Sequence, residues 1–349
     1  MITVNVNAST SYNVIIGKGL LDTLGEQVKN TLGECRVCIV TDDTVDGLYG
    51  ARAEASLRSC GIDAIKFVIA HGEASKNTQN LVALLEFLAS NRITRSDAII
   101  ALGGGVVGDL AGFAAGVYLR GIRFIQVPTT LLAAVDSSVG GKTAVDLVAG
   151  KNLAGVFHQP SLVVCDPDTL DTLSPAIFAD GCAEVIKYGV INDREFFDQL
   201  KSGIRNNIEF VISACVKRKA DIVEKDEFDN GCRQLLNLGH TVGHAIEACS
   251  DFEISHGSAV AIGMAIVTKI AVALSICPQA DLDELIDVLR KNDLPVDCPF
   301  DAQQLTEIAT TDKKRFGGTV SFIIPHGIGN CKPLKVSVED ICNFISKGL

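Results

Sequence analysis

Half of the chain's six histidines lie within a short stretch of its second half. His240 and His244 stand four residues apart in LLNLGHTVGHAIE, and His256 follows in ISHGSAV. On a helix, residues four apart project from the same face, so this spacing is typical of a metal site. A zinc metalloprotease would carry glutamate directly after the first histidine. Thr241 occupies that position, which argues against a protease.

A catalytic metal usually has three protein ligands and one open position, so a carboxylate ligand is expected beside the histidines. Glu184, in DGCAEVIKYG on a predicted helix, is the candidate. Lys187 lies on the same face of that helix and could act on the same ligand. The residues alone leave open whether His240 or His244 binds the metal. The alternative is a structural role, in which the histidines cap helices or form hydrogen bonds in the core. Three histidines so close together argue against it.

Glycine-rich segments of the first half indicate anion binding. ALGGGVVGDLAGFAAG places Gly103–Gly105 between a predicted strand and a helix, where backbone N–H groups can face a phosphate. A plain tight turn remains the alternative, because the spacing differs from the usual dinucleotide fingerprint. DSSVGGKT resembles a P-loop, but Asp136 stands where glycine is needed and a predicted helix precedes it, so we reject that interpretation. Lys142, Lys151 and Asn152 could still clamp a phosphate or carboxylate.

The first half alternates predicted strands with helices. RVCIVTDD, DAIKFVIA, SDAIIALGGG and RFIQVPTT are the strands, which predicts a mostly parallel sheet covered on both faces. Ligands bind such sheets at the carboxyl ends of the strands, so Asp42, Gly103–Gly105, Thr129 and Thr130 should share one edge. After SLVVCDPDTLDTLSP the pattern becomes largely helical, and AVAIGMAIVTKIAVAL predicts a buried helix. We therefore expect two domains, 1–170 and 171–349.

Composition limits the class of protein. The 349 residues are 47% hydrophobic and carry a formal charge of −11, which argues against nucleic-acid binding as the main function. We expect neither a leader nor a membrane span, and therefore a soluble cytoplasmic chain with no membrane partner. The twelve cysteines are scattered through apolar contexts and are expected to be reduced and mostly buried. Cys35 and Cys38 fall in a predicted strand and should face opposite sides, which argues against a zinc or redox pair.

Long segments, in order along nearly the whole chain, resemble the 3-dehydroquinate synthase family of sugar phosphate cyclases. They are GGGVVGDLAGFAA, LRGIRFIQVPTTLLAAVDSSVGGKTAVD, GKNLAGVFHQP, GCAEVIKYG, LLNLGHTVGHAIE, SHGSAVAIGM and DKKRFGG. The resemblance implies a Rossmann-like NAD-binding domain and a mainly helical domain that binds metal and substrate. It implies conversion of 3-deoxy-D-arabino-heptulosonate 7-phosphate to 3-dehydroquinate and phosphate in the shikimate pathway of aromatic amino acid biosynthesis. NAD is oxidant and then reductant within each turnover, zinc or cobalt is the metal, and the enzyme is a homodimer.

The resemblance also implies roles for individual residues. It makes Glu184, His240 and His256 the metal ligands, and His244 a neighbour that contacts substrate. The NAD-binding positions are Asp42, Glu73, Lys76, Gly104, Gly105, Val106, Asp109, Thr129, Thr130, Lys142, Lys151, Thr169, Leu170, Thr172 and Leu173. The substrate-binding and catalytic positions are Arg120, Asp136, Lys142, Asn152, Lys187, Lys219, Arg233, Asn237, His244 and Lys314, with Lys313 an alternative to the last. One departure is Asp229, where many members carry glutamate.

Three other functions compete with this one. Another sugar phosphate cyclase, such as 2-deoxy-scyllo-inosose synthase or a sedoheptulose 7-phosphate cyclase, would use similar residues on a different sugar. An iron-type NAD-dependent alcohol dehydrogenase of related fold would accumulate NADH. A non-catalytic regulator that binds sugar phosphates would not need the metal trio and the set of lysines.

Overall fold

The computed structural model describes residues 1–309 and 318–349. The contacts among them form two compact units. Unit 1 comprises Met1–Leu173 and Ile212–Phe228, and unit 2 comprises Ser174–Val211 and Asp229–Leu349. The segment Ile212–Phe228 lies beyond residue 170 in the sequence but packs with unit 1, where Glu227 accepts hydrogen bonds from Ser9 and Gln159. Such pairings are not visible in a local sequence pattern.

Unit 1 is built on a seven-stranded sheet in the order β1-β2-β9-β6-β5-β3-β4. The strands are β1 (Ile2–Val6), β2 (Tyr12–Ile16), β3 (Val37–Asp42), β4 (Ala64–Ile69), β5 (Ala98–Gly103), β6 (Arg123–Pro128) and β9 (Leu162–Cys165). Every neighbouring pair is parallel except β1 and β2. The predicted strands are β3 to β6, and the structure adds β1, β2 and β9.

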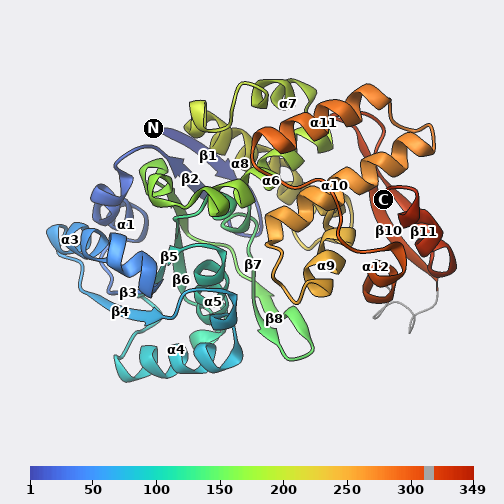
Figure 1. Ribbon diagram of the computed structural model, residues 1–349. Coiled ribbons are helices and arrows are strands. Elements are labelled where there is room, and N and C mark those ends of the chain that lie inside the picture. Colours follow the sequence, from blue (N-terminus) through green and yellow to red (C-terminus); the bar gives the residue numbers. More distant parts are fainter. Residues whose placement is uncertain (310–317) are drawn as a thin grey trace. The chain divides into compact units, whose positions relative to one another are not determined.

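Helices cover both faces of this sheet (Figure 1). On one face, Val37 and Ile39 of β3 join a cluster with α1 (Leu24–Leu32) and α3 (Ala51–Ser59). On the other, Cys38 and Val40 join a cluster with α4 (Thr78–Ser90) and α5 (Gly105–Val117). Because both faces are buried, the strands are almost continuously apolar, as parallel strands usually are.

Shorter elements complete unit 1. They are η1 (Leu20–Thr23), α2 (Asp43–Val45), η2 (Asp46–Gly50), η3 (Glu73–Ser75), η4 (Tyr118–Arg120), η5 (Ala133–Ser137), η6 (Pro167–Thr172), the antiparallel hairpin of β7 (Lys142–Leu147) and β8 (Gly150–Phe157), and most of α8 (Ile208–Lys225). The helix expected over TTLLAAV ends in the π-helical turn η5. The strand that follows it, β7, belongs to the hairpin and not to the parallel sheet, so the P-loop topology is absent from this segment.

Unit 2 is mainly helical. Its elements are α6 (Pro175–Asn192), α7 (Arg194–Leu200), η7 (Arg205–Asn207), η8 (Cys232–Asn237), α9 (His240–Cys249), α10 (His256–Ala273), α11 (Gln279–Lys291), α12 (Ala302–Ala309), β10 (Thr319–Pro325), β11 (Cys331–Ser337), η9 (Val338–Asp340) and α13 (Ile341–Ser346). Among the described helices, α10 alone is long and apolar enough to cross a membrane, and 72% of it is buried. That burial is typical of a core helix, as predicted.

Glycines let α9 and α10 approach each other closely. A Cβ atom on Gly263 of α10 would lie 2.1 Å from the carbonyl oxygen of Gly239, and one on Gly239 would lie 2.7 Å from the carbonyl oxygen of Val260. Gly243, one turn after Gly239, packs against Ala259 and Val260 in the same way. One side of α9 is therefore a glycine face against α10, and this contact sets the rotation of α9 about its axis.

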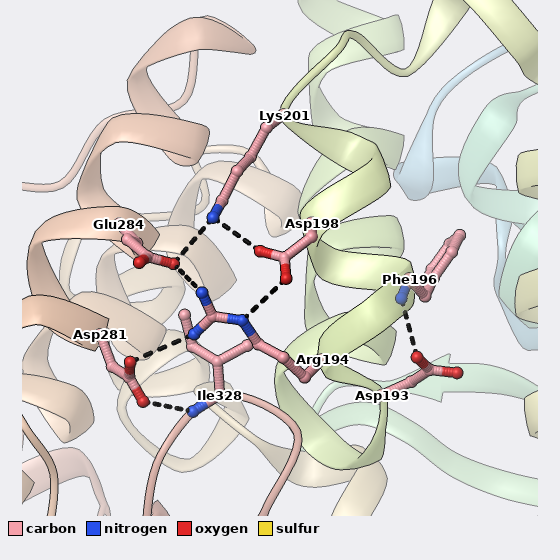
Figure 2. A network of polar contacts seen from close by, with 8 residues as sticks. All are labelled: Asp193, Arg194, Phe196, Asp198, Lys201, Asp281, Glu284 and Ile328. Atoms are coloured by element: carbon pink, nitrogen blue, oxygen red, sulfur yellow. Dashed lines mark hydrogen bonds and ion pairs between the residues drawn. The ribbon is translucent and has the colours of Figure 1, made fainter.

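A network of charged groups joins α7, α11 and the turn between β10 and β11 (Figure 2). Arg194 donates to Asp198 (3.1 Å), Asp281 (3.2 Å) and Glu284 (2.6 Å). The second carboxylate oxygen of Asp281 accepts the backbone N–H of Ile328 at 2.8 Å. Asp281 thus holds the turn and the guanidinium at once.

We expect Asp281→Ala to lower the free energy of unfolding by about 1–2 kcal/mol, because the largely buried N–H of Ile328 loses its acceptor. Urea denaturation at low and high salt measures this. Asp283→Ala on the same helix is the control; Asp283 is exposed, so a change within about 0.5 kcal/mol is expected. Equal effects of the two substitutions would contradict the assigned role of Asp281.

Candidate active site

Helix α6 carries the acidic member of the cluster. Ser174 caps the helix by accepting the N–H of Ile177, and Pro175 occupies its first turn. Glu184 and Lys187 lie three residues apart on one face, with side chains only 1% exposed, and their carboxylate and ammonium form an ion pair. A buried carboxylate needs such partners because it has lost its hydration.

Helix α9 begins at His240, which directs one ring nitrogen toward Glu184. Its Nδ1 lies 3.1 Å from the carbonyl oxygen of Leu238. A carbonyl can only accept a hydrogen bond, so Nδ1 is the donor, and whenever the ring is neutral its lone pair lies on Nε2. That Nε2 lies 3.4 Å from Oε1 of Glu184.

Helix α10 begins at His256, which reaches the same carboxylate oxygen. Its Nε2 lies 3.5 Å from Oε1 of Glu184, and its Nδ1 lies 3.3 Å from Oε2 of Glu247. The start of α10 is tied to α6, because Asp180 accepts hydrogen bonds from the Ser255 hydroxyl (2.5 Å) and from the Ser258 N–H (3.2 Å). Asp180 lies one turn before Glu184 on α6. The helix that carries Glu184 therefore also holds the start of α10, where His256 lies.

These three residues fit a divalent metal ion. One ligand atom from each of Glu184, His240 and His256 lies within 4.8 Å of the others. Two imidazoles and a carboxylate, with Nδ1 of each histidine held by an outer acceptor, form the donor set of a catalytic zinc or cobalt site. His244 is exposed beside them, with its ring centroid 5.5 Å from that of His240.

The electrostatics of the cluster favour a cation. Burial alone would raise the pKa of Glu184, but the Lys187 ammonium and the two imidazoles hold the pKa of that carboxyl well below its ordinary value. Burial would lower the pKa of His256, yet its contacts with Glu184 and Glu247 raise it to about 10. The negative charge that attracts a proton here would also attract a metal ion, which releases that proton on binding.

In unit 1, the carboxyl ends of β3, β5 and β6 lie at one edge of the sheet, as their parallel pairing requires. Asp42 ends β3 and caps α2, accepting the N–H groups of Thr44 (3.0 Å) and Val45 (2.9 Å). Gly104, Gly105 and Val106 open α5, and Thr129, after β6, donates its N–H to Gly103. The shared edge predicted for these positions is therefore present. Their contacts with a cofactor stay a prediction.

Lys76 forms ion pairs with three carboxylates near that edge. Its ammonium lies 2.7 Å from Glu73, 3.4 Å from Asp109 and 3.9 Å from Asp146, and its side chain is only 6% exposed. Burial would lower the pKa of Lys76, but the carboxylates raise it. Burial also raises the pKa of Asp109 to about 6, against the opposing effect of Lys76. Glu73, Lys76 and Asp109 are thus brought together, whereas Asp146 was not predicted from the sequence.

The shift at Asp109 should make stability depend on pH. Its pKa is about 4 when unfolded and about 6 when folded, so its contribution is present below pH 4 and is lost as the pH rises through 6. About a fifth of the side chain is exposed, so we expect a loss of about 1–2 kcal/mol.

Relative to Asp109→Asn, the free energy of unfolding of the unaltered chain should therefore fall between about pH 4 and pH 7, measured by urea denaturation. Asp221→Asn, at an exposed position of α8, is the control and should show no such trend. If the free energy of unfolding of the unaltered chain instead rose with pH relative to that of Asp109→Asn, the ion pair with Lys76 would outweigh the effect of burial on Asp109.

The remaining predicted residues of unit 1 are spread over several elements. The Lys219 ammonium of α8 pairs with the Asp136 carboxylate of η5. Arg120, Lys142 and Asn152 are exposed, and Lys151 is partly buried, on η4, β7 and β8. The predicted segment Thr169–Leu173 follows β9; the Tyr49 hydroxyl contacts Thr172 and donates to the carbonyl of Thr169. Lys219 and Asp136, both predicted from the sequence, are thus brought together by a direct ion pair.

Two more predicted residues lie just before α9. Arg233 is buried and Asn237 is exposed, both on η8. Asp229 has left-handed backbone angles, with φ of 59°. Lys313 and Lys314 lie outside the described residues. Asp180 and Glu247 were missed by the sequence reasoning. For Glu247 a signal existed: it follows His240 by seven residues and His244 by three, the spacing of one helical face.

Two family models match the chain in succession. The N-terminal model of 3-dehydroquinate synthase covers residues 66–180, and the C-terminal model covers residues 181–315. The chain belongs to the 3-dehydroquinate synthase family. A curated relative, 3-dehydroquinate synthase from Clostridium acetobutylicum, is 43% identical over 342 residues, or 96% of either chain.

Two solved structures have a fold similar to that of this chain over nearly its whole length. A 2-deoxy-scyllo-inosose synthase complexed with carbaglucose-6-phosphate, NAD⁺ and Co²⁺ matches all of both chains with a TM-score of 0.88 and 27% identity. A 2-epi-5-epi-valiolone synthase from Streptomyces hygroscopicus with NAD⁺ and Zn²⁺ bound matches 98% of both chains, with a TM-score of 0.88 and 28% identity. The predicted family, fold class and enzyme class are confirmed, and so is the main function over its alternatives.

Proposed function

We propose that the chain converts 3-deoxy-D-arabino-heptulosonate 7-phosphate to 3-dehydroquinate and phosphate, with NAD and a zinc or cobalt ion as cofactors. The observation that carries this proposal is the arrangement of Glu184, His240 and His256 around one point beside Lys187. The related cyclases with NAD⁺ and Co²⁺ or Zn²⁺ support the choice of cofactors. The higher identity to a curated 3-dehydroquinate synthase supports the choice of substrate.

Each cofactor supplies one kind of chemistry when bound: the metal acidifies a substrate hydroxyl, and NAD accepts a hydride that is returned in the same turnover. Glu184, His240 and His256 would hold the metal. The strand ends of unit 1, together with Lys76 and Asp109, would hold NAD. Asp42, Gly104, Gly105, Thr129 and Thr130 would contribute from that edge.

Cations would bind the phosphate and carboxylate of the substrate. Lys187 is suited to this because Glu184 and burial fix its ammonium in one position. Arg233 is also buried and can present a rigid fork to an anion. Local cations such as these reconcile an anionic substrate with a chain of charge −11. His244 and Asn237, exposed near His240, would contact the hydroxyl groups.

We further propose that the enzyme works in the cytoplasm as a homodimer, without nucleic-acid or membrane partners. Its substrate is a small, soluble sugar phosphate. The burial of α10 supports an enzyme outside the membrane.

A phosphate-release assay on the heptulosonate phosphate tests the function. We expect equal amounts of phosphate and 3-dehydroquinate, no accumulation of NADH, and loss of activity on adding chelator or omitting NAD⁺ from stripped enzyme. An alcohol dehydrogenase would instead accumulate NADH. Sedoheptulose 7-phosphate and glucose 6-phosphate serve as competing substrates. Turnover of either one without turnover of the heptulosonate would contradict the proposal.

A further inference from the structure

We propose that Glu247 is a positioning residue for the metal site: its carboxylate holds Nδ1 of His256, so that Nε2 of the same ring faces Glu184. The inference rests on the metal site of the proposed function. It concerns a residue outside the predicted ligand and substrate sets. Three features of unit 2 support this role for Glu247.

The first feature is where Glu247 lies. Its side chain is only 4% exposed, and Oε2 lies 3.3 Å from Nδ1 of His256. The turn that joins α9 to α10 makes this contact possible, because the carbonyl of Glu247 accepts the N–H of Phe252 (2.8 Å) and the Ser250 hydroxyl (2.9 Å). The chain thus folds back on the end of α9 before His256 begins α10.

The second feature is the parallel with His240. Both histidines present Nε2 to Oε1 of Glu184, at 3.4 and 3.5 Å. For His240 the outer acceptor is the backbone carbonyl of Leu238, which no substitution can remove. For His256 the outer acceptor is a side chain. When a metal displaces the second ring proton, an ionised carboxylate at this position keeps the remaining proton on Nδ1, which leaves the lone pair on Nε2.

The third feature indicates that Glu247 is an outer acceptor and not a metal ligand. His244, Glu247 and His256 form a second group whose donor atoms lie within 4.8 Å of one another. Nδ1 of His256 cannot donate a hydrogen bond to Glu247 and bind a metal at the same time, so a metal on the Glu184 side leaves Glu247 as the outer acceptor. Two histidines already oriented toward Glu184 favour that side.

Metal affinity of the full-length, metal-stripped protein tests the inference, with Co²⁺ or Zn²⁺ in competition with a chromophoric chelator. We expect Glu247→Ala to bind about 10–100-fold more weakly than the unaltered chain. Glu247→Gln should lose less, because its amide oxygen can still accept from Nδ1. Glu284→Gln, in the Arg194 network of the same unit, is the matched control and should bind as the unaltered chain does.

A spectroscopic readout separates orientation from folding. Nitrogen NMR of the imidazoles should show the proton of His256 on Nδ1 in the metal-loaded, unaltered chain. The signal is assigned by its absence in His256→Gln. The visible spectrum of the Co²⁺ form should change in Glu247→Ala while the circular dichroism spectrum stays the same. A purely structural residue would lower stability without moving the Co²⁺ spectrum or the affinity.

The outcomes remain distinguishable from failure of the proposed function. No metal binding by the unaltered chain would overturn the metal site itself. Normal binding by that chain, with both Glu247 variants within twofold of it, would overturn the role of Glu247 alone. Complete loss of binding in Glu247→Gln, with binding retained in Glu184→Gln, would also overturn it, because Glu247 would then be a ligand.

Discussion

Replacing His256 with alanine is expected to lower kcat for phosphate release by more than about a thousandfold. The substitution removes one of the three candidate metal donors, the His256 Nε2 that lies 3.5 Å from Oε1 of Glu184. A metal contributes several kcal/mol of charge stabilisation to a transition state, and about 4 kcal/mol corresponds to a thousandfold change in rate. The measurement is steady-state phosphate release at saturating heptulosonate phosphate and NAD⁺.

The His256 side chain is about a third exposed, so its loss should leave the fold intact. Circular dichroism and NAD⁺ binding verify this. His326→Ala is the matched control: His326 is exposed in the turn between β10 and β11, and its kcat should be unchanged. A kcat for His256→Ala within tenfold of the unaltered chain would contradict a metal role for this residue.

Replacing Gly263 with alanine is expected to cost about 3 kcal/mol of unfolding free energy or more. The added Cβ would lie 2.1 Å from the carbonyl oxygen of Gly239 and 3.1 Å from the N–H nitrogen of Gly243. Both neighbours are backbone atoms, one at the N-cap of α9 and one in its first turn, so no side-chain rotation can relieve the clash, and the helices must separate. Because His240 directly follows Gly239, metal affinity should fall together with stability.

Urea denaturation and the chelator competition described above measure the two effects of Gly263→Ala. Gly47→Ala is the control, because a Cβ at Gly47 would have nothing within 4 Å and its backbone needs no positive φ. That variant should be as stable as the unaltered chain or slightly more so. If Gly263→Ala lost less than about 1 kcal/mol, the close contact of α9 with α10 would not be what orients His240.

The sequence by itself determined the class of fold and the residue types of the site. Apolar strands that alternate with helices required a parallel sheet, and parallel pairing required Asp42, Gly103 and Thr129 to share an edge. These conclusions depend on local periodicity and on the parallel direction that alternating strands and helices impose. Helical spacing likewise placed His240 and His244 on one face of their helix, and Glu184 and Lys187 on one face of a different helix.

The tertiary structure decided what spacing could not. Residues four apart on a helix share a face, but which of them turns toward Glu184 depends on how the helix is rotated. Here the glycine face of α9 against α10 sets that rotation, so His240 faces Glu184 and His244 is exposed. The contact of Glu247 with His256 and the packing of 212–228 with unit 1 arose in the same way. Each depends on contacts between segments that no local pattern encodes.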